Sequence, residues 1–111
     1  MTKIFFIFLS LSLFALSPVS GAIYKGQKVF VKKCVGCHDT GQAFVAEHRI
    51  RDYKKWMSKK GKPLAQLHLK SKKAKKSHKY FKSSSYAKKS KHLKDFLTEY
   101  AKDSGNVPAC N

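Results

Sequence analysis

The sequence predicts a small all-α domain, and two observations support that prediction. Beyond residue 23, apolar residues recur at three- and four-residue steps through most of the chain, which is the spacing of one helix face. No segment reads as a convincing strand, and no internal repeat is present. Gly61, Pro63 and Gly105 interrupt the pattern and divide it into separate helices.

The first 22 residues have the features of a secretory signal peptide. Lys3 is followed by an uncharged apolar stretch from Ile4 to Leu16, and residues 20–22 are small, as is typical of a cleavage site. The apolar stretch is shorter than the roughly 20 residues that cross a bilayer, which disfavours an uncleaved membrane anchor. We therefore expect a signal peptide at 1–22 and a mature domain at 23–111, located in the periplasm.

The helices of the mature domain are predicted from apolar spacing and from residues that start or stop helices. Gly61 is expected to stop a helix, Pro63 suits a first helical turn, and serines in the loop that begins at Lys82 can cap the last helix. Gly105 is expected to end that helix. The expected elements are a helix over 23–33, a turn at 39–42, one or two helical pieces over 43–61, a helix over 63–81 and a last helix over 86–103.

Several of these helices have a recognisable apolar face. Gly26 and Phe30 lie on the same side of the first helix, and Trp56 is expected to be buried. The helix over 63–81 presents a face made of Leu64, Leu67, Ser71, Ala74, His78 and Phe81. The last helix presents a stripe made of Leu93, Phe96, Leu97 and Tyr100.

The chain is strongly basic, with a formal net charge of +18. Between Lys54 and Lys94 there are 16 lysines and no acidic residue. Lysine rather than arginine suits diffuse attraction better than bidentate recognition of phosphate or bases. Such a run is either a solvated face or a surface that steers the protein toward an acidic redox partner or an anionic membrane surface. An exported protein rarely meets nucleic acid, so we do not expect a nucleic-acid partner.

The motif CVGCH places Cys34, Cys37 and His38 at the spacing used for covalent haem attachment. Two thiols add to the two vinyl groups of the porphyrin, and the following histidine reaches the iron. A structural zinc site needs four ligands, but the second close pair is missing, because Cys110 is solitary and the later histidines are widely spaced. A redox dithiol would follow a strand, and none precedes Cys34. Haem also supplies a core for a domain too small to build a large one.

The segments around this motif resemble those of class I c-type cytochromes. The stretch GQKVFVKKCVGCH is similar to the N-terminal helix of that family, with Gly26 and Phe30 at its small and aromatic positions. The stretch LKDFLTEYA resembles the C-terminal helix that crosses it, with Phe96 or Tyr100 as the crossing aromatic. The resemblance implies a cytochrome c-like helical domain around one covalently bound haem c.

The middle of the chain departs from the family pattern. The family usually has a proline loop whose carbonyl accepts the free N–H of the proximal histidine, but no proline occurs between Cys37 and Gly61. Another carbonyl is expected to hold His38 in its place.

Several residues are candidates for the sixth iron ligand. Class I members mostly use a methionine, but Met57 lies early in the chain beside Trp56, where packing is the simpler explanation. His68 lies in the most apolar stretch of the middle and is the preferred candidate. His78 is the other alternative, a lysine or an open position is not excluded by the sequence, and His48 and His92 are expected at the surface.

The resemblance implies an electron carrier rather than an enzyme. The expected function is a periplasmic monohaem cytochrome that passes single electrons between respiratory or oxidoreductase partners, for example an oxidase, a quinol-oxidising complex or a periplasmic dehydrogenase, or that serves as the electron-accepting subunit of an oxidoreductase. An open haem that binds a gas ligand and a non-haem zinc-binding module are the alternatives. Cys110 is expected to be either a surface thiol or a link to a second subunit.

Overall fold

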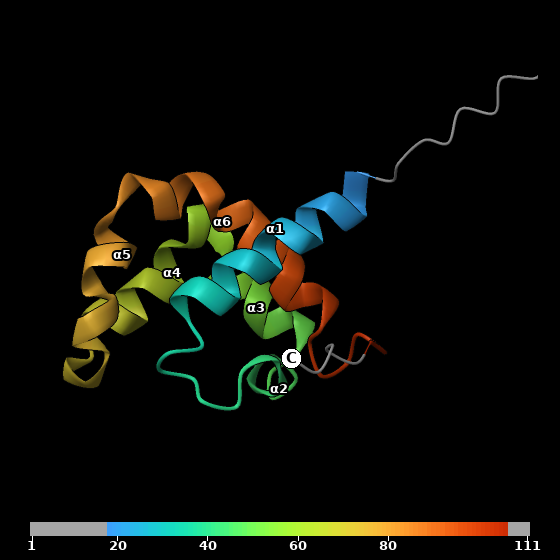
Figure 1. Cartoon of the computed structure of the whole chain (residues 1–111), viewed down its shortest axis with the longest axis horizontal. Coiled ribbons are helices and arrows are strands. Elements are labelled where there is room, and N and C mark those ends of the chain that lie inside the picture. Colours follow the sequence, from blue (N-terminus) through green and yellow to red (C-terminus); the bar gives the residue numbers. More distant parts are fainter. Residues whose placement is uncertain (1–17, 107–111) are drawn as a thin grey trace, which may run out of the picture.

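Helices and turns make up residues 18–106, the part of the chain that this computed structural model describes (Figure 1). No strand occurs within that range, so the predicted all-α fold is confirmed. Residues 1–17, which hold most of the predicted signal peptide, and Cys110 lie outside the described residues. Among the helices so described, none combines the length and the apolar character needed to cross a membrane. The elements are α1 (Pro18–Lys33), α2 (Gln42–Val45), α3 (Ile50–Trp56), α4 (Ser58–Leu69), the 3₁₀ helix η1 (Lys72–Ser77), α5 (His78–Lys82) and α6 (Ser84–Glu99).

The crossing of α1 over α6 organises the fold (Figure 1). At the crossing, Phe30 and Phe96 are 2% and 0% exposed, and their ring centroids lie 5.3 Å apart. Gly26 allows the close approach, because a Cβ atom there would lie 1.9 Å from the backbone carbonyl oxygen of His92. The predicted roles of Gly26 and Phe30 on one face of the first helix are therefore confirmed.

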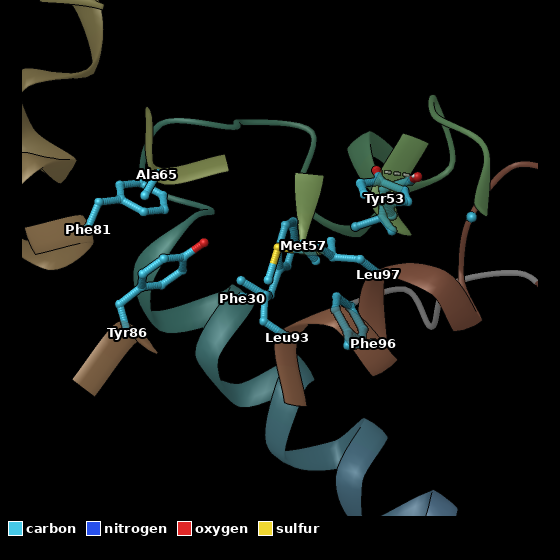
Figure 2. Packing of buried hydrophobic residues seen from close by; sticks show 11 residues of the cluster. Phe30, Tyr53, Met57, Ala65, Phe81, Tyr86, Leu93, Phe96 and Leu97 are labelled. Carbon is cyan, nitrogen blue, oxygen red and sulfur yellow. Dashed lines mark hydrogen bonds between the residues drawn. The ribbon is translucent and has the colours of Figure 1, made fainter. Parts of the chain in front are cut away.

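A buried core extends from this crossing to α3, α4 and α5 (Figure 2). The helix α6 supplies several of its buried side chains, α4 contributes Ala65 and α5 contributes Phe81. The Met57 side chain lies within this core and is 3% exposed. The buried hydrophobic residues are Phe30, Val45, Tyr53, Met57, Ala65, Phe81, Tyr86, Leu93, Phe96, Leu97 and Ala101.

The predicted single helix over 63–81 is wrong, because the structure divides this stretch into α4, η1 and α5. The lysines of η1 and α5 recur at three- and four-residue spacing, where like charges destabilise a continuous α-helix. The end of α4 is also held by His78, whose Nε2 donates to the carbonyl oxygens of His68 and Ser71 at 2.8 Å and 3.0 Å. These hydrogen bonds hold the start of α5 against the end of α4, so the two segments do not form one continuous helix.

Three other predicted boundaries also shift. The first helix begins at Pro18 rather than at residue 23. The serine loop shrinks to Ser83 alone, because Ser84 already belongs to α6. The last helix ends at Glu99 rather than near Gly105, and turns occupy the residues between them. The predicted break at Gly61 is confirmed, since its backbone has a φ of 76° and interrupts the regular helix within α4.

The break at Gly61 fixes where the regular part of α4 begins. The hydroxyl of Tyr86 in α6 donates a hydrogen bond to the Gly61 carbonyl. A Cβ at position 61 would meet the Tyr86 hydroxyl, so only glycine suits both the positive φ and the space. Pro63 then lies in the first turn after the break, as predicted. The contact ties α4, which carries His68, to the N-terminal turn of α6.

Ser83 caps α6, and its removal gives a measurable loss of stability. Its Oγ accepts a hydrogen bond from the backbone N–H of Tyr86 at 3.2 Å. We expect Ser83→Ala to lower the free energy of unfolding by about 1 kcal/mol, the usual value of a serine cap. Denaturant unfolding of the haem-loaded protein measures it, and Ser85→Ala, at an exposed helical position, is the matched control. Equal stability of the two variants would contradict the cap.

Candidate functional site

The CxxCH motif begins where α1 ends. The backbone N–H of Cys34 still donates to the Phe30 carbonyl at 2.8 Å, so Cys34 continues the last turn of the helix. The N–H groups of Cys37 and His38 then both turn back to the Cys34 carbonyl, at 3.1 Å and 3.0 Å. This tight turn leaves Cys37 exposed and Cys34 and His38 half-buried, and the two cysteines are not joined to each other by a disulfide.

Two adjoining cavities of about 370 Å³ and 180 Å³ open beside the motif. Both are lined by Cys34 and His38 on one side and by α4 and α5 on the other. The larger cavity also reaches Cys37 and η1, and the smaller one reaches the aromatic residues of α2 and α3. The residues shared by both are Cys34, His38, Leu67, His68 and Phe81.

Burial sets the protonation of the motif. It raises the pKa of the Cys34 thiol to about 12, with a smaller contribution from Cys37. Burial also lowers the pKa of His38, helped by the charge of nearby His68, while Glu47 and Asp39 oppose the shift. The site therefore favours an uncharged sulfur and a neutral imidazole. A thioether sulfur is uncharged, and the neutral imidazole is the form that binds a metal.

Of the three residues predicted as candidates for the sixth ligand, one lines the cavities. His68 faces His38 across them, with ring centroids 6.3 Å apart and ring planes at 86°. Met57 lines neither cavity and is packed in the core. The ring of His78 turns to the backbone at the end of α4 instead.

Several aromatic residues around the site were missed or misplaced by sequence reasoning. Phe44 stacks on His38, with ring centroids 4.0 Å apart and planes at 17°. His48 was expected at the surface but is half-buried, with its ring centroid 4.9 Å from that of Trp56. Trp56 is itself half-buried rather than buried, and both line the smaller cavity. The four-residue spacing of Phe44 and His48, just after the motif, could have indicated that the two side chains lie on one face and contact each other.

The surroundings of His92 also differ from expectation. His92 is half-buried, not exposed, and its Nδ1 is buried without a hydrogen-bond partner among the described residues. Packing on Phe44 restrains the His38 ring. The expectation that a carbonyl accepts the free N–H of His38 stays a prediction.

The walls of the two cavities fit a haem better than a metal ion alone. Within residues 18–106, no group of three or more His, Cys, Asp or Glu side chains gathers as a metal-ion site. The smaller cavity is instead lined by aromatic and aliphatic side chains, which suit a large flat apolar group. The aromatic and aliphatic side chains at its wall are Phe30, Phe44, Tyr53, Trp56, Leu64, Leu67, Phe81, Leu93 and Leu97.

An all-helical domain with a CxxCH turn facing an apolar cavity defines a class of protein, that of proteins with covalently attached haem. The family model for cytochrome c matches residues 23–104. The chain belongs to the cytochrome c family, and it accordingly carries one covalently bound haem c. Searches of curated proteins and of solved structures gave no match. Members of this family generally act as electron carriers rather than as enzymes.

Proposed function

We propose that this protein is an exported, periplasmic electron carrier that accepts and donates one electron at a time. The haem is attached through Cys34 and Cys37, and His38 is the proximal ligand. The apolar stretch after Lys3 supports export, and covalent haem attachment of this kind takes place outside the cytoplasm. Cell fractionation of the full-length chain tests the location, since a cytoplasmic haem-free product would contradict it.

The observation that carries the proposal is the position of the motif against the cavity. Cys34 and His38 line both parts of the cavity, while Cys37 lines only the larger part and is exposed. A haem held by these residues would have one edge near the exposed Cys37 and its body among the apolar side chains of the cavity. Such an arrangement lets electrons reach the group at its edge while the walls exclude water from the rest.

The residues around the cavity have distinct tasks in this function. Haem supplies the one-electron redox centre when it is bound. Cys34 and Cys37 fix its edge, and His38, restrained by Phe44, holds a nitrogen toward it. Phe30 and Leu93 close the inner wall. Because no bond in the chain forms or breaks, a rigid fold that changes little between oxidation states suits the transfer.

Redox titration of the haem-loaded protein tests the proposal. We expect a reversible titration that follows the Nernst equation for one electron, with the same curve in the oxidative and reductive directions. A protein that binds haem but undergoes irreversible reduction, or that turns over a substrate at the haem, would contradict an electron carrier. Absence of covalent haem would contradict the site itself.

A basic rim beside the site suggests the chemistry of the partner. Lys33 and Lys73 both line the larger cavity, next to Cys37. Further exposed lysines continue along η1 and α5. We propose that an acidic surface of a redox partner docks over this rim and brings its own redox group close to the exposed edge. An anionic membrane surface is the other partner compatible with the charge.

Salt is expected to weaken this attraction measurably. Oxidation of the reduced protein by ferricyanide, an anion, should slow by about tenfold as ionic strength rises from low values to physiological salt, where the screening length is about 8 Å. A cationic cobalt complex should show the opposite trend. Stopped-flow measurements provide both rates, and rates that do not change with salt would contradict electrostatic steering.

Two double variants distinguish the effect of the basic rim on this rate from the effect of net charge. The double variant Lys33→Gln/Lys73→Gln should slow the reaction with ferricyanide at low salt more than Lys25→Gln/Lys102→Gln does. The second pair removes the same charge from exposed positions that line neither cavity. Equal slowing by the two pairs would mean that net charge, and not this rim, steers the encounter.

A further inference from the structure

His68 occupies the wall of the cavity opposite His38, and the distance between the two rings is informative. Their centroids lie 6.3 Å apart. With about 2 Å from each nitrogen to a metal and about 1 Å from nitrogen to ring centre, two imidazoles on opposite sides of one metal have centroids about 6 Å apart. The angle of 86° between the planes is compatible, because each ring can rotate about its own metal–nitrogen axis.

The hydrogen bond of His68 selects the tautomer that a metal requires. Its Nδ1 lies 2.8 Å from the carbonyl oxygen of Leu64, one turn earlier in α4. A carbonyl oxygen only accepts, so Nδ1 carries the proton and donates it. Nε2 of the neutral ring is then left with a free lone pair. Histidines that bind metals characteristically donate their other N–H to a carbonyl in this way.

Packing restrains the same ring. Phe81 of α5 stacks on His68, with ring centroids 4.2 Å apart and planes at 26°. Phe81 is itself buried and lines both cavities. The carbonyl of His68 is bound by Nε2 of His78, which steadies the end of α4. Three contacts therefore restrain His68: the hydrogen bond from its Nδ1, the stacking of Phe81 on one face of its ring, and the hydrogen bond to its backbone carbonyl.

The two rival residues are otherwise engaged. Met57 packs beside Gly61, where a Cβ built on the glycine would lie 3.2 Å from the Met57 methyl carbon, and it lines neither cavity. Nε2 of His78 faces two carbonyl oxygens and must therefore carry its proton. His78 also lines neither cavity, so neither residue presents a ligand atom to the haem site.

We propose that His68 is the second axial ligand of the haem iron, opposite His38. This inference rests on the proposed function, because it takes the haem to be attached at Cys34 and Cys37. It departs from the methionine ligand usual for class I members. Two nitrogen ligands predict a lower reduction potential than the Met/His pair, because sulfur favours the ferrous state. They also close the iron to gas ligands.

Spectroscopy of the haem-loaded wild-type protein tests this ligand without any variant. We expect a low-spin ferric haem that lacks the weak far-red band of a sulfur-to-iron bond. The near-infrared band should fall at the energy typical of two imidazoles rather than of imidazole and amine. A sulfur band, an amine-type band that would point to Lys73, or a high-spin haem would each overturn the assignment.

Variants supply the second test. His68→Ala should convert the ferric haem to high spin and let the ferrous form bind carbon monoxide readily. His68→Met should restore low spin, add the sulfur band and raise the potential. Met57→Leu, which removes the sulfur at similar volume, is the matched control and should leave the spectrum unchanged. An unaltered spectrum in His68→Ala, or a changed one in Met57→Leu, would overturn the proposal.

The failure of this inference is distinguishable from failure of the proposed function. The mass of each denatured protein shows whether haem is attached. His68→Ala with attached haem and a wild-type spectrum refutes His68 as a ligand, whereas a wild-type chain without haem refutes the function. Should His68→Ala not fold, the wild-type near-infrared spectrum and the shifted potential of His68→Met still decide the ligand.

Discussion

The double variant Cys34→Ala/Cys37→Ala is expected to contain no covalently bound haem. Both thiols lie at the edge of the cavity, and no other cysteine lies within residues 18–106 to replace them. Covalent haem, measured by gel staining after denaturation, should fall from one per chain to background. Without the group, the apolar walls of the cavity would face water, so the cooperative thermal transition should also be lost.

Cys110→Ser is the control for the double variant, because it removes a thiol outside the motif. It should retain haem and the thermal transition of the wild-type protein. Covalent haem in the double variant would contradict the attachment site. Loss of haem in Cys110→Ser would contradict the assignment of the two thiols to Cys34 and Cys37.

Gly26→Ala should cause the largest loss of stability among single changes outside the motif. A Cβ at this position would lie 1.9 Å from the His92 carbonyl oxygen and 2.7 Å from the Cβ of Phe96. The obstacle is backbone, which cannot turn aside as a flexible side chain does, so α1 and α6 must separate. Overpacking of this kind typically costs about 1–3 kcal/mol, and we expect the upper end.

Gly36→Ala is the matched control for this prediction. It adds the same methyl group at an exposed glycine, where nothing beyond the two adjacent residues lies within 4 Å of the new carbon. Denaturant unfolding of both haem-loaded variants measures the difference. Similar midpoints for Gly26→Ala and Gly36→Ala would mean that the helix crossing is looser than its geometry indicates.

The two ends of the domain could be predicted because local sequence decides them. Gly26 and Phe30 lie four residues apart on one face, and Phe96 continues the stripe of the last helix. These patterns specify a close crossing whatever lies between them. The motif at Cys34 likewise follows directly from spacing, and the structure places it where the first helix ends.

The middle was harder to predict because its structure depends on contacts distant in the sequence. The apolar spacing from Leu64 to Phe81 suits one helix, yet lysine repulsion and the His78 contacts to the end of α4 break it. The surroundings of His48 depend on α2 and α3 folding against the motif, which periodicity does not reveal. The apolar stretch around His68 did indicate that this residue lies in apolar surroundings. Its role as an iron ligand is a proposal.

The most direct test of this account is the intact mass of the exported wild-type protein, measured after denaturation. We expect the mass of the mature polypeptide plus one haem, and this mass persists after acid–acetone extraction, which removes any haem that is not covalently bound. A bare polypeptide mass would contradict covalent attachment at Cys34 and Cys37. It would leave the cavity beside His38 and His68 to a different ligand.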